Sequence, residues 1–289
     1  MTIGEIVRQG FYYARTCRSL WLFGFFVGIA SGGSSGGGGA GGDGRAGGAS
    51  VGVGGVSIGG RLDLSVTEIV PIAIVVLLAI AAFTVMRFVG EGALIEGIAR
   101  ARRGGTMTTR EGFRAGWAHW GVLVRIALLY LAATIGSVAL LVAPCVIALR
   151  ALGALGGVLV AIPALVIAVP WLVTLYLAQA FAWRIAVLEN RHALDAIAKA
   201  RLFLHGRLLH GLKLVVATLV GTLAIVLVSV VAILPVALLL VALIPVLRLF
   251  PVIVIASLVL LPAVYVLTAL LGTFRSSIWT IGYMTQVEA

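Results

Sequence analysis

Long apolar runs recur along the whole chain and limit what it can fold into. Hydropathy marks six such segments, at roughly 12–31, 66–90, 121–147, 153–183, 214–246 and 249–274. A helix of about 20 mostly apolar residues is long enough to cross the hydrocarbon core of a bilayer. Hydrophobic residues make up 62% of the chain and charged residues 11%, which excludes a water-soluble globule, since soluble domains carry about 25% charged residues. The segments therefore predict transmembrane helices.

The first segment is the weakest of the six. Its apolar centre runs only from Leu20 to Ala30, and Arg15 and Arg18 precede it. A basic start followed by a short apolar stretch also fits a secretory signal peptide, which stays the alternative. We expect an uncleaved first helix, because an aromatic-rich segment suits a retained span. The aromatic residues are Trp21, Phe23, Phe25 and Phe26.

The basic residues are distributed unevenly between the two sides of the predicted spans. With the N-terminus in the cytoplasm, all but four of the 21 basic residues fall on the cytoplasmic side; the exceptions are Arg45, Arg61, Arg150 and Arg248. The opposite orientation would reverse this ratio against the positive-inside rule. Both termini are therefore predicted to be cytoplasmic. The net charge of +11 reports orientation in this interpretation, and no nucleic-acid partner is expected.

Two stretches of the chain resemble each other. Residues 70–102 align with residues 169–201, both opening on Val-Pro, and a fainter third copy runs from Pro262 to Arg275. The matched charged positions are Glu96 with Asp195, Arg100 with Lys199, and Arg102 with Arg201. The repeat predicts three similar helical hairpins around a pseudo-axis along the membrane normal. Biased apolar composition is the alternative explanation.

The segments before the later hairpins are predicted to be amphipathic helices at the cytoplasmic membrane surface. Thr108 and Glu111 have the spacing of a capping box, and Phe113, Trp117 and Trp120 fall on one helical face. Residues 190–213 form the equivalent segment. Acidic and basic residues four apart, Glu96 with Arg100 and Asp195 with Lys199, are expected to pair.

A cytoplasmic basic collar follows from these segments. Its predicted members are Arg100, Arg102, Arg110, Arg114, Lys199, Arg201 and Arg207, with Trp117 and Trp120 as interfacial anchors. Each basic residue near an anionic membrane surface contributes about 1 kcal/mol of attraction. The collar is expected to bind anionic lipid headgroups or an acidic protein partner. Ordinary snorkelling flanks explain the same residues equally well.

Residues 32–60 contain 16 glycines. Such a segment cannot bury enough apolar surface to offset its ordering entropy, so it predicts a flexible external loop over about residues 32–62. We expect a simple spacer. Docking through its valine-rich end, residues 51–58, is the alternative.

The chain contains no recognisable catalytic or metal-binding pattern. Cys17 and Cys145 lie far apart, and the histidines lack metal-ligand spacing. No ionisable residue falls mid-way along a predicted span, where coupled transporters and intramembrane hydrolases usually place one. No cofactor, no metal and no catalytic residue are therefore predicted.

These predictions combine into an all-α polytopic membrane protein of six helices in three hairpins. The chain is expected to form one membrane domain, residues 1–289. Its predicted parts are 1–31 with the first helix, 32–62 with the glycine-rich loop, 63–103 with the second helix, 104–189 with the second hairpin, and 190–289 with the third hairpin and tail.

Three strings carry a family resemblance: ALIEGIARARRG at 93–104, AVLENRHALDAIAKARLFLHGR at 186–207, and TFRSSIWTIGY at 273–283. The chain resembles uncharacterised bacterial six-helix membrane proteins related to the membrane domain of glycerophosphoryl diester phosphodiesterases. The resemblance covers the membrane domain and does not extend to the soluble catalytic domain of those phosphodiesterases. The resemblance implies a multi-pass protein of the bacterial inner membrane and no hydrolase activity.

The predicted function is non-enzymatic. We expect a scaffold or subunit that organises a protein partner or anionic lipid at the cytoplasmic leaflet, because the chain lacks catalytic groups and carries basic, aromatic segments. A passive transporter or channel for a hydrophobic or lipid-like solute, with the pseudo-axis as its path, is the alternative.

Overall fold

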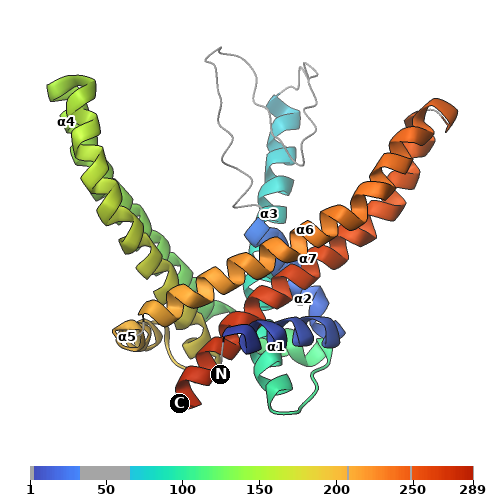
Figure 1. The fold of residues 1–289 in the computed structure, drawn as a ribbon, viewed down its shortest axis with the longest axis horizontal. Helices are drawn as coiled ribbons and strands as arrows, with labels where there is room; N and C mark the ends of the chain where they lie inside the picture. Colours follow the sequence, from blue (N-terminus) through green and yellow to red (C-terminus); the bar gives the residue numbers. More distant parts are fainter. Residues whose placement is uncertain (1–2, 33–65, 207, 248, 289) are drawn as a thin grey trace.

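The computed structural model describes residues 3–32, 66–206, 208–247 and 249–288, and every regular element in these ranges is helical (Figure 1). The elements are α1 (Ile3–Thr16), the 3-10 helix η1 (Arg18–Leu20), α2 (Trp21–Gly32), α3 (Val66–Arg102), α4 (Thr109–Leu188), α5 (Ala193–Leu204), α6 (Leu208–Leu247) and α7 (Leu249–Glu288). The predicted all-α class is confirmed for these residues. Most of the predicted glycine-rich loop, and Arg207, lie outside them.

Five helical segments are long and apolar enough to cross a membrane. They are Val70–Arg102, Thr109–Ala151, Gly153–Leu188, Leu208–Leu240 and Ile253–Glu288. The apolar stretch predicted as the first span is different: it covers only Arg18–Ala30 and is too short to count among them. The helix is interrupted just before this stretch, because Cys17 has non-helical backbone angles and η1 separates α1 from α2. The length criterion thus supports five of the six predicted spans.

The long helices form three arms that diverge from a common base (Figure 1). One arm is α4, which folds back on itself at Gly153, where φ is 72° and ψ is −166°. Only glycine adopts these angles without strain. The second arm is the antiparallel pair of α6 and α7, and the third is the outer part of α3. Both chain termini lie at the base (Figure 1).

The packed core lies in the base, and the arms are exposed. In α3 the side chains of Ile95 and Ile98 are completely buried, whereas that of Leu77, further out, is 67% exposed. The same change occurs along α4, where Ile185 is buried and Val166 exposed. Apolar arms with an uncovered surface are what a helix presents when lipid chains are its solvent, and the base alone buries side chains as a soluble core does.

Helix α2 packs against α7 through glycines. Gly24 and Gly28 are four apart, the spacing that lets two membrane helices approach closely. A Cβ placed on Gly272 of α7 would overlap the backbone oxygen of Gly24, and one on Gly28 would overlap the backbone oxygen of Thr268. The two backbones are therefore in direct contact, which holds the short α2 against the end of the α7 arm.

The predicted capping box at the start of α4 is confirmed. The Glu111 amide donates to Thr108 Oγ1 over 3.4 Å, and the Thr108 amide donates to the Glu111 carboxylate over 2.9 Å. Replacing Thr108 with alanine is expected to cost about 1 kcal/mol, as loss of an N-cap hydroxyl generally does. Thermal unfolding of the purified protein measures the loss, and Thr106→Ala, an exposed threonine in the preceding turn, is the matched control. Equal decreases in unfolding temperature in Thr108→Ala and Thr106→Ala would contradict a stabilising role for the capping box.

Candidate functional site

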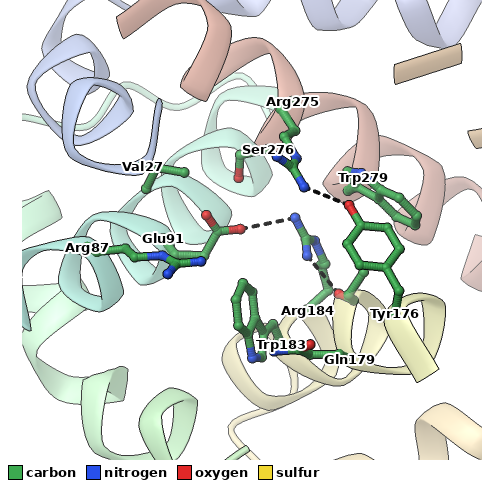
Figure 2. A pocket seen from close by; sticks show the side chains of 11 residues that line it. Val27, Arg87, Glu91, Tyr176, Gln179, Trp183, Arg184, Arg275, Ser276 and Trp279 are labelled. Carbon is green, nitrogen blue, oxygen red and sulfur yellow. Dashed lines mark hydrogen bonds and ion pairs between the residues drawn. The ribbon is translucent and has the colours of Figure 1, made fainter. Parts of the chain in front are cut away.

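A cavity of about 210 Å³ lies in the base, where α2, α3, the second half of α4, and α7 meet (Figure 2). It is much larger than the 10–15 Å³ or so that one water needs on this scale. Its lining consists of Val27, Arg87, Glu91, Tyr176, Gln179, Ala180, Trp183, Arg184, Arg275, Ser276 and Trp279. Charged and aromatic side chains from separate parts of the sequence therefore converge on one space.

A buried ion pair joins α3 to α4 at this cavity. Arg184 Nη2 lies 3.1 Å from Glu91 Oε1, with the two side chains only 4% and 9% exposed. Arg184 Nη1 also donates to the backbone oxygen of Ala180 over 2.7 Å, and its guanidinium lies 5.8 Å from the Trp279 ring centre. A buried charge requires such compensation, so Arg184 is held in one position.

Two more arginines line the cavity, on other helices. Arg275 of α7 donates from Nη2 to the Tyr176 hydroxyl over 2.7 Å, and Arg87 of α3 lies 5.8 Å from the Phe88 ring centre. Among the described residues, no ion pair joins Arg87 or Arg275 to a carboxylate. The lining thus holds three guanidinium groups and one carboxylate, an arrangement that attracts an anion.

Several hydrogen-bond donors at the cavity have no partner within the part of the chain that the structure describes. They are Arg184 Nε, Trp183 Nε1 and the Ser276 hydroxyl. Ser276 is 1% exposed and Arg184 is 3% exposed. A buried donor without a partner costs about 1–3 kcal/mol. These donors favour an acceptor-rich ligand.

The residues around the cavity are buried on the side of the base and more exposed on the side of the arms. Helix α3 and the second half of α4 both run toward the base (Figure 1), so Arg87 lies nearer the arms than Glu91 on α3, and Tyr176 lies nearer the arms than Arg184 on α4. Arg87 is half-buried and Tyr176 is exposed, whereas Glu91 and Arg184 are buried. Beyond this level the side chains of both helices are largely buried. The exposed part of the lining therefore lies on the side of the apolar arms.

A second, shallower depression lies at the start of α4. It is lined by Arg110, Phe113, Arg114 and Trp117. The Phe113 and Trp117 rings are stacked with centres 5.8 Å apart, and Trp120 lies 5.8 Å beyond Trp117. These aromatic residues share one helical face as predicted. Their helix runs on directly into the α4 arm, so it is no separate surface helix.

The other described members of the predicted basic collar, Arg100, Arg102, Lys199 and Arg201, lie at the base, and several are paired. Arg100 lies 3.5 Å from Glu96, as expected, and Arg102 lies 2.6 Å from Glu288. The expected pairing of Lys199 with Asp195 is wrong, because Lys199 Nζ lies 2.6 Å from Glu189. Arg201 is exposed on α5. A headgroup or partner site on the collar stays a prediction.

Glu189 organises the turn between α4 and α5. It accepts from Lys199, from Arg191 over 2.9 Å and from the Tyr283 hydroxyl over 2.7 Å. Partial burial raises the pKa of Glu189, but the hydrogen bonds from these three residues together outweigh it, so the pKa is lowered from its usual range. Glu189 therefore stays ionised and ties α5 and α7 to the end of α4.

The cavity is not predicted by the sequence. The charge distribution predicts only that Arg87, Arg184 and Arg275 flank the spans on the cytoplasmic side, and it predicts no role for Glu91. The signal was present in the hydropathy boundaries, since the apolar runs expected to end at 90, 183 and 274 stop one residue before Glu91, Arg184 and Arg275. The string TFRSSIWTIGY contributes Arg275, Ser276 and Trp279 to the lining.

No group of His, Cys, Asp and Glu suited to a metal ion occurs among the described residues. Arginine, tryptophan, tyrosine and serine side chains line the cavity, and such groups can donate hydrogen bonds to an anion and contact an apolar group. Comparison of the chain with protein-family models, with curated proteins and with solved structures finds no match.

Proposed function

We propose that this protein is a non-enzymatic membrane protein that binds an anionic lipid, with the headgroup in the cavity and the hydrocarbon chains between the arms. The observation that carries the proposal is a cavity at the foot of the apolar arms whose lining contains three arginines and a single glutamate. Guanidinium groups bind phosphate and carboxylate strongly, because they offer several donors in a fixed plane.

The apolar arms explain why the ligand is proposed to be a lipid and not a soluble anion. An ion arriving from water would have to cross the uncovered hydrocarbon-like surface of the arms to reach Arg87 and Arg275. A lipid already lies there, with its headgroup at the level where the apolar runs end. Charged residues at that depth are costly unless they serve a function or are paired, and Glu91 pairs with only one of the three arginines.

The membrane topology belongs to the same proposal. We infer six spans in three hairpins, with α2 as a short first span, both termini cytoplasmic, and the base at the cytoplasmic leaflet of a bacterial inner membrane. The excess of basic residues toward the base supports this orientation, and the termini lie together at the base (Figure 1). The resemblance to the phosphodiesterase membrane domain agrees with this topology.

Passive transport of a lipid-like solute is a second candidate. The observation that favours it is the divergence of the three arms around the cavity, which leaves apolar surface on each arm uncovered. A transporter would release its ligand on both sides of the membrane. Transfer of a fluorescent lipid between the leaflets of proteoliposomes, compared with protein-free vesicles, distinguishes transport from retention.

Neutralising Arg275 is expected to reduce the anionic lipid that co-purifies with the protein by about tenfold, the effect of losing roughly 1.4 kcal/mol of interaction. Arg275→Gln keeps a donor of similar shape but loses the charge. The measurement is mass spectrometry of lipids extracted after purification in mild detergent. Arg103→Gln is the matched control, since Arg103 is exposed at the base.

Unchanged retention of anionic lipid in Arg275→Gln, or equal losses in both variants, would contradict binding in the cavity. If the double variant Arg110→Gln and Arg114→Gln loses anionic lipid while Arg275→Gln retains it, the lipid binds at the basic collar and not in the cavity. A stoichiometric protein partner in the same preparation would favour the scaffold function over lipid binding.

A further inference from the structure

We propose that the cavity selects a phosphomonoester headgroup, which carries two negative charges, as in a phosphatidate-type lipid. This inference rests on the proposed function and specifies the ligand class of the same site. A phosphomonoester carries about −1.5 to −2 charge at neutral pH and offers three strong acceptor oxygens. A phosphodiester headgroup, by comparison, carries one charge.

The charge of the lining is the first argument. Arg87, Arg184 and Arg275 carry three positive charges, and Glu91 is the only carboxylate among the lining residues. The lining therefore has an excess of two positive charges in a space surrounded by protein and lipid. Charges interact strongly there, because little water screens them. A dianion balances this excess, whereas a monoanion leaves one charge unbalanced.

The free donors are the second argument. The buried Arg184 Nε and Ser276 hydroxyl both border the cavity without a partner among the described residues. Figure 2 shows Arg184, Arg275 and Glu91 turned toward one another from three helices. Arg275 donates to the Tyr176 hydroxyl, and in the described part of the chain neither Arg275 nor Arg87 forms an ion pair with a carboxylate. A terminal phosphate has enough oxygens to accept from all of these donors.

The position of Glu91 argues against a zwitterionic headgroup. A phosphoethanolamine or phosphocholine group would need a carboxylate for its cationic end. Glu91 lies 3.1 Å from Arg184 and is 6% exposed, so it already compensates a buried charge. If Glu91 paired with a cationic ligand group, Arg184 would be left as an unpaired buried charge, which is strongly destabilising.

The test compares two lipids that differ by one methyl group. Phosphatidate and phosphatidylmethanol with identical acyl chains differ in headgroup charge, dianionic against monoanionic, and hardly in size. Purified protein in nanodiscs of neutral phosphatidylcholine receives each lipid, and native mass spectrometry measures the bound fraction at pH 8. We expect phosphatidate to bind about tenfold more tightly or better.

A charge-neutralised variant assigns the preference to the cavity. In Arg87→Gln the excess is one positive charge, so the two lipids are expected to bind within about twofold of each other, a difference of roughly 0.4 kcal/mol. Arg103→Gln is expected to keep the wild-type preference. A preference for phosphatidate that survives Arg87→Gln undiminished would overturn the charge-matching argument.

The remaining outcomes separate this inference from the proposed function. Equal binding of phosphatidate and phosphatidylmethanol, both tighter than phosphatidylcholine, overturns the dianion inference and leaves anionic-lipid binding intact. Binding of neither above phosphatidylcholine, or a preference for phosphatidylethanolamine, overturns both. Glycerol 3-phosphate serves as the soluble competitor, and displacement of phosphatidate by an equimolar amount of it would show that the headgroup alone is the ligand, which contradicts a lipid site.

Discussion

Replacing Arg184 with methionine is expected to lower the free energy of unfolding by about 3–5 kcal/mol, the usual cost of leaving one member of a buried ion pair alone. Glu91 is 6% exposed, and Arg184 is its ion-pair partner among the described residues, so the variant would leave a buried carboxylate unpaired. The variant would also lose the hydrogen bond to Ala180 and the contact with the Trp279 ring. Reversible unfolding in mixed detergent micelles, without added lipid, measures the change.

Two control variants test whether the isolated buried charge of Glu91 causes the loss of stability. The double variant Glu91→Gln with Arg184→Met removes both charges and is expected to recover more than half of the lost stability, because coupled residues are not additive. Glu96→Gln breaks the exposed pair with Arg100, whose side chains are 30% and 42% exposed, and is expected to cost less than about 0.5 kcal/mol. A double variant no more stable than Arg184→Met would show that lost packing, and not the isolated charge, causes the destabilisation.

Replacing Gly272 with valine is expected to destabilise the protein by about 3 kcal/mol or more, at or above the upper end of the usual range for overpacking. The new side chain would overlap the backbone oxygen of Gly24, and a backbone atom cannot turn aside as a flexible side chain can. Helix α2 must therefore move away from α7. Since Val27 of α2 lines the cavity, lipid retention should fall as well.

Gly136→Val is the matched control for this substitution. Gly136 is also a helical glycine of a membrane arm, but a Cβ there meets nothing within 4 Å. Valine at that position is expected to change stability by less than about 0.5 kcal/mol, as surface substitutions usually do. If the two valine variants lose the same stability in the micelle experiment, the lower helix propensity of valine explains the loss. The close contact of α2 with α7 would then not contribute to stability.

The sequence predicted the parts of this protein that depend on neighbouring residues. Long apolar runs appear as helices α3, α4, α6 and α7, because in a bilayer a helix satisfies every backbone group within its own segment. The capping box of Thr108 with Glu111, and the pairing of Glu96 with Arg100, were predicted from spacings of three and four residues. The interruption before α2 was not predicted, and it makes this apolar helix shorter than the five segments that are long enough to cross a membrane.

The cavity could not be predicted, because it depends on contacts between distant residues. Glu91 and Arg184 are 93 positions apart, and Tyr176 and Arg275 are 99 apart. In the sequence each charged residue only ends an apolar run, the pattern of an ordinary interfacial flank. Whether such a residue faces water, lipid or another charge depends on the helix packed against it. The basic collar, by contrast, was inferred from local charge density, and part of it turned out to be paired.

The helical class, the apolar arms and the capping box at Thr108 follow from local sequence, because hydrogen bonds within one helix and the spacing of side chains around it need no partner helix. Which charged residues meet depends on how the helices pack. Close glycine contacts set α2 beside α7, the turn at Gly153 brings the second half of α4 back to α3, and together these bring three arginines and one glutamate to the lining of one cavity. Charges interact strongly only when they are close together and away from water, so this cluster of charges depends on the packing of the helices.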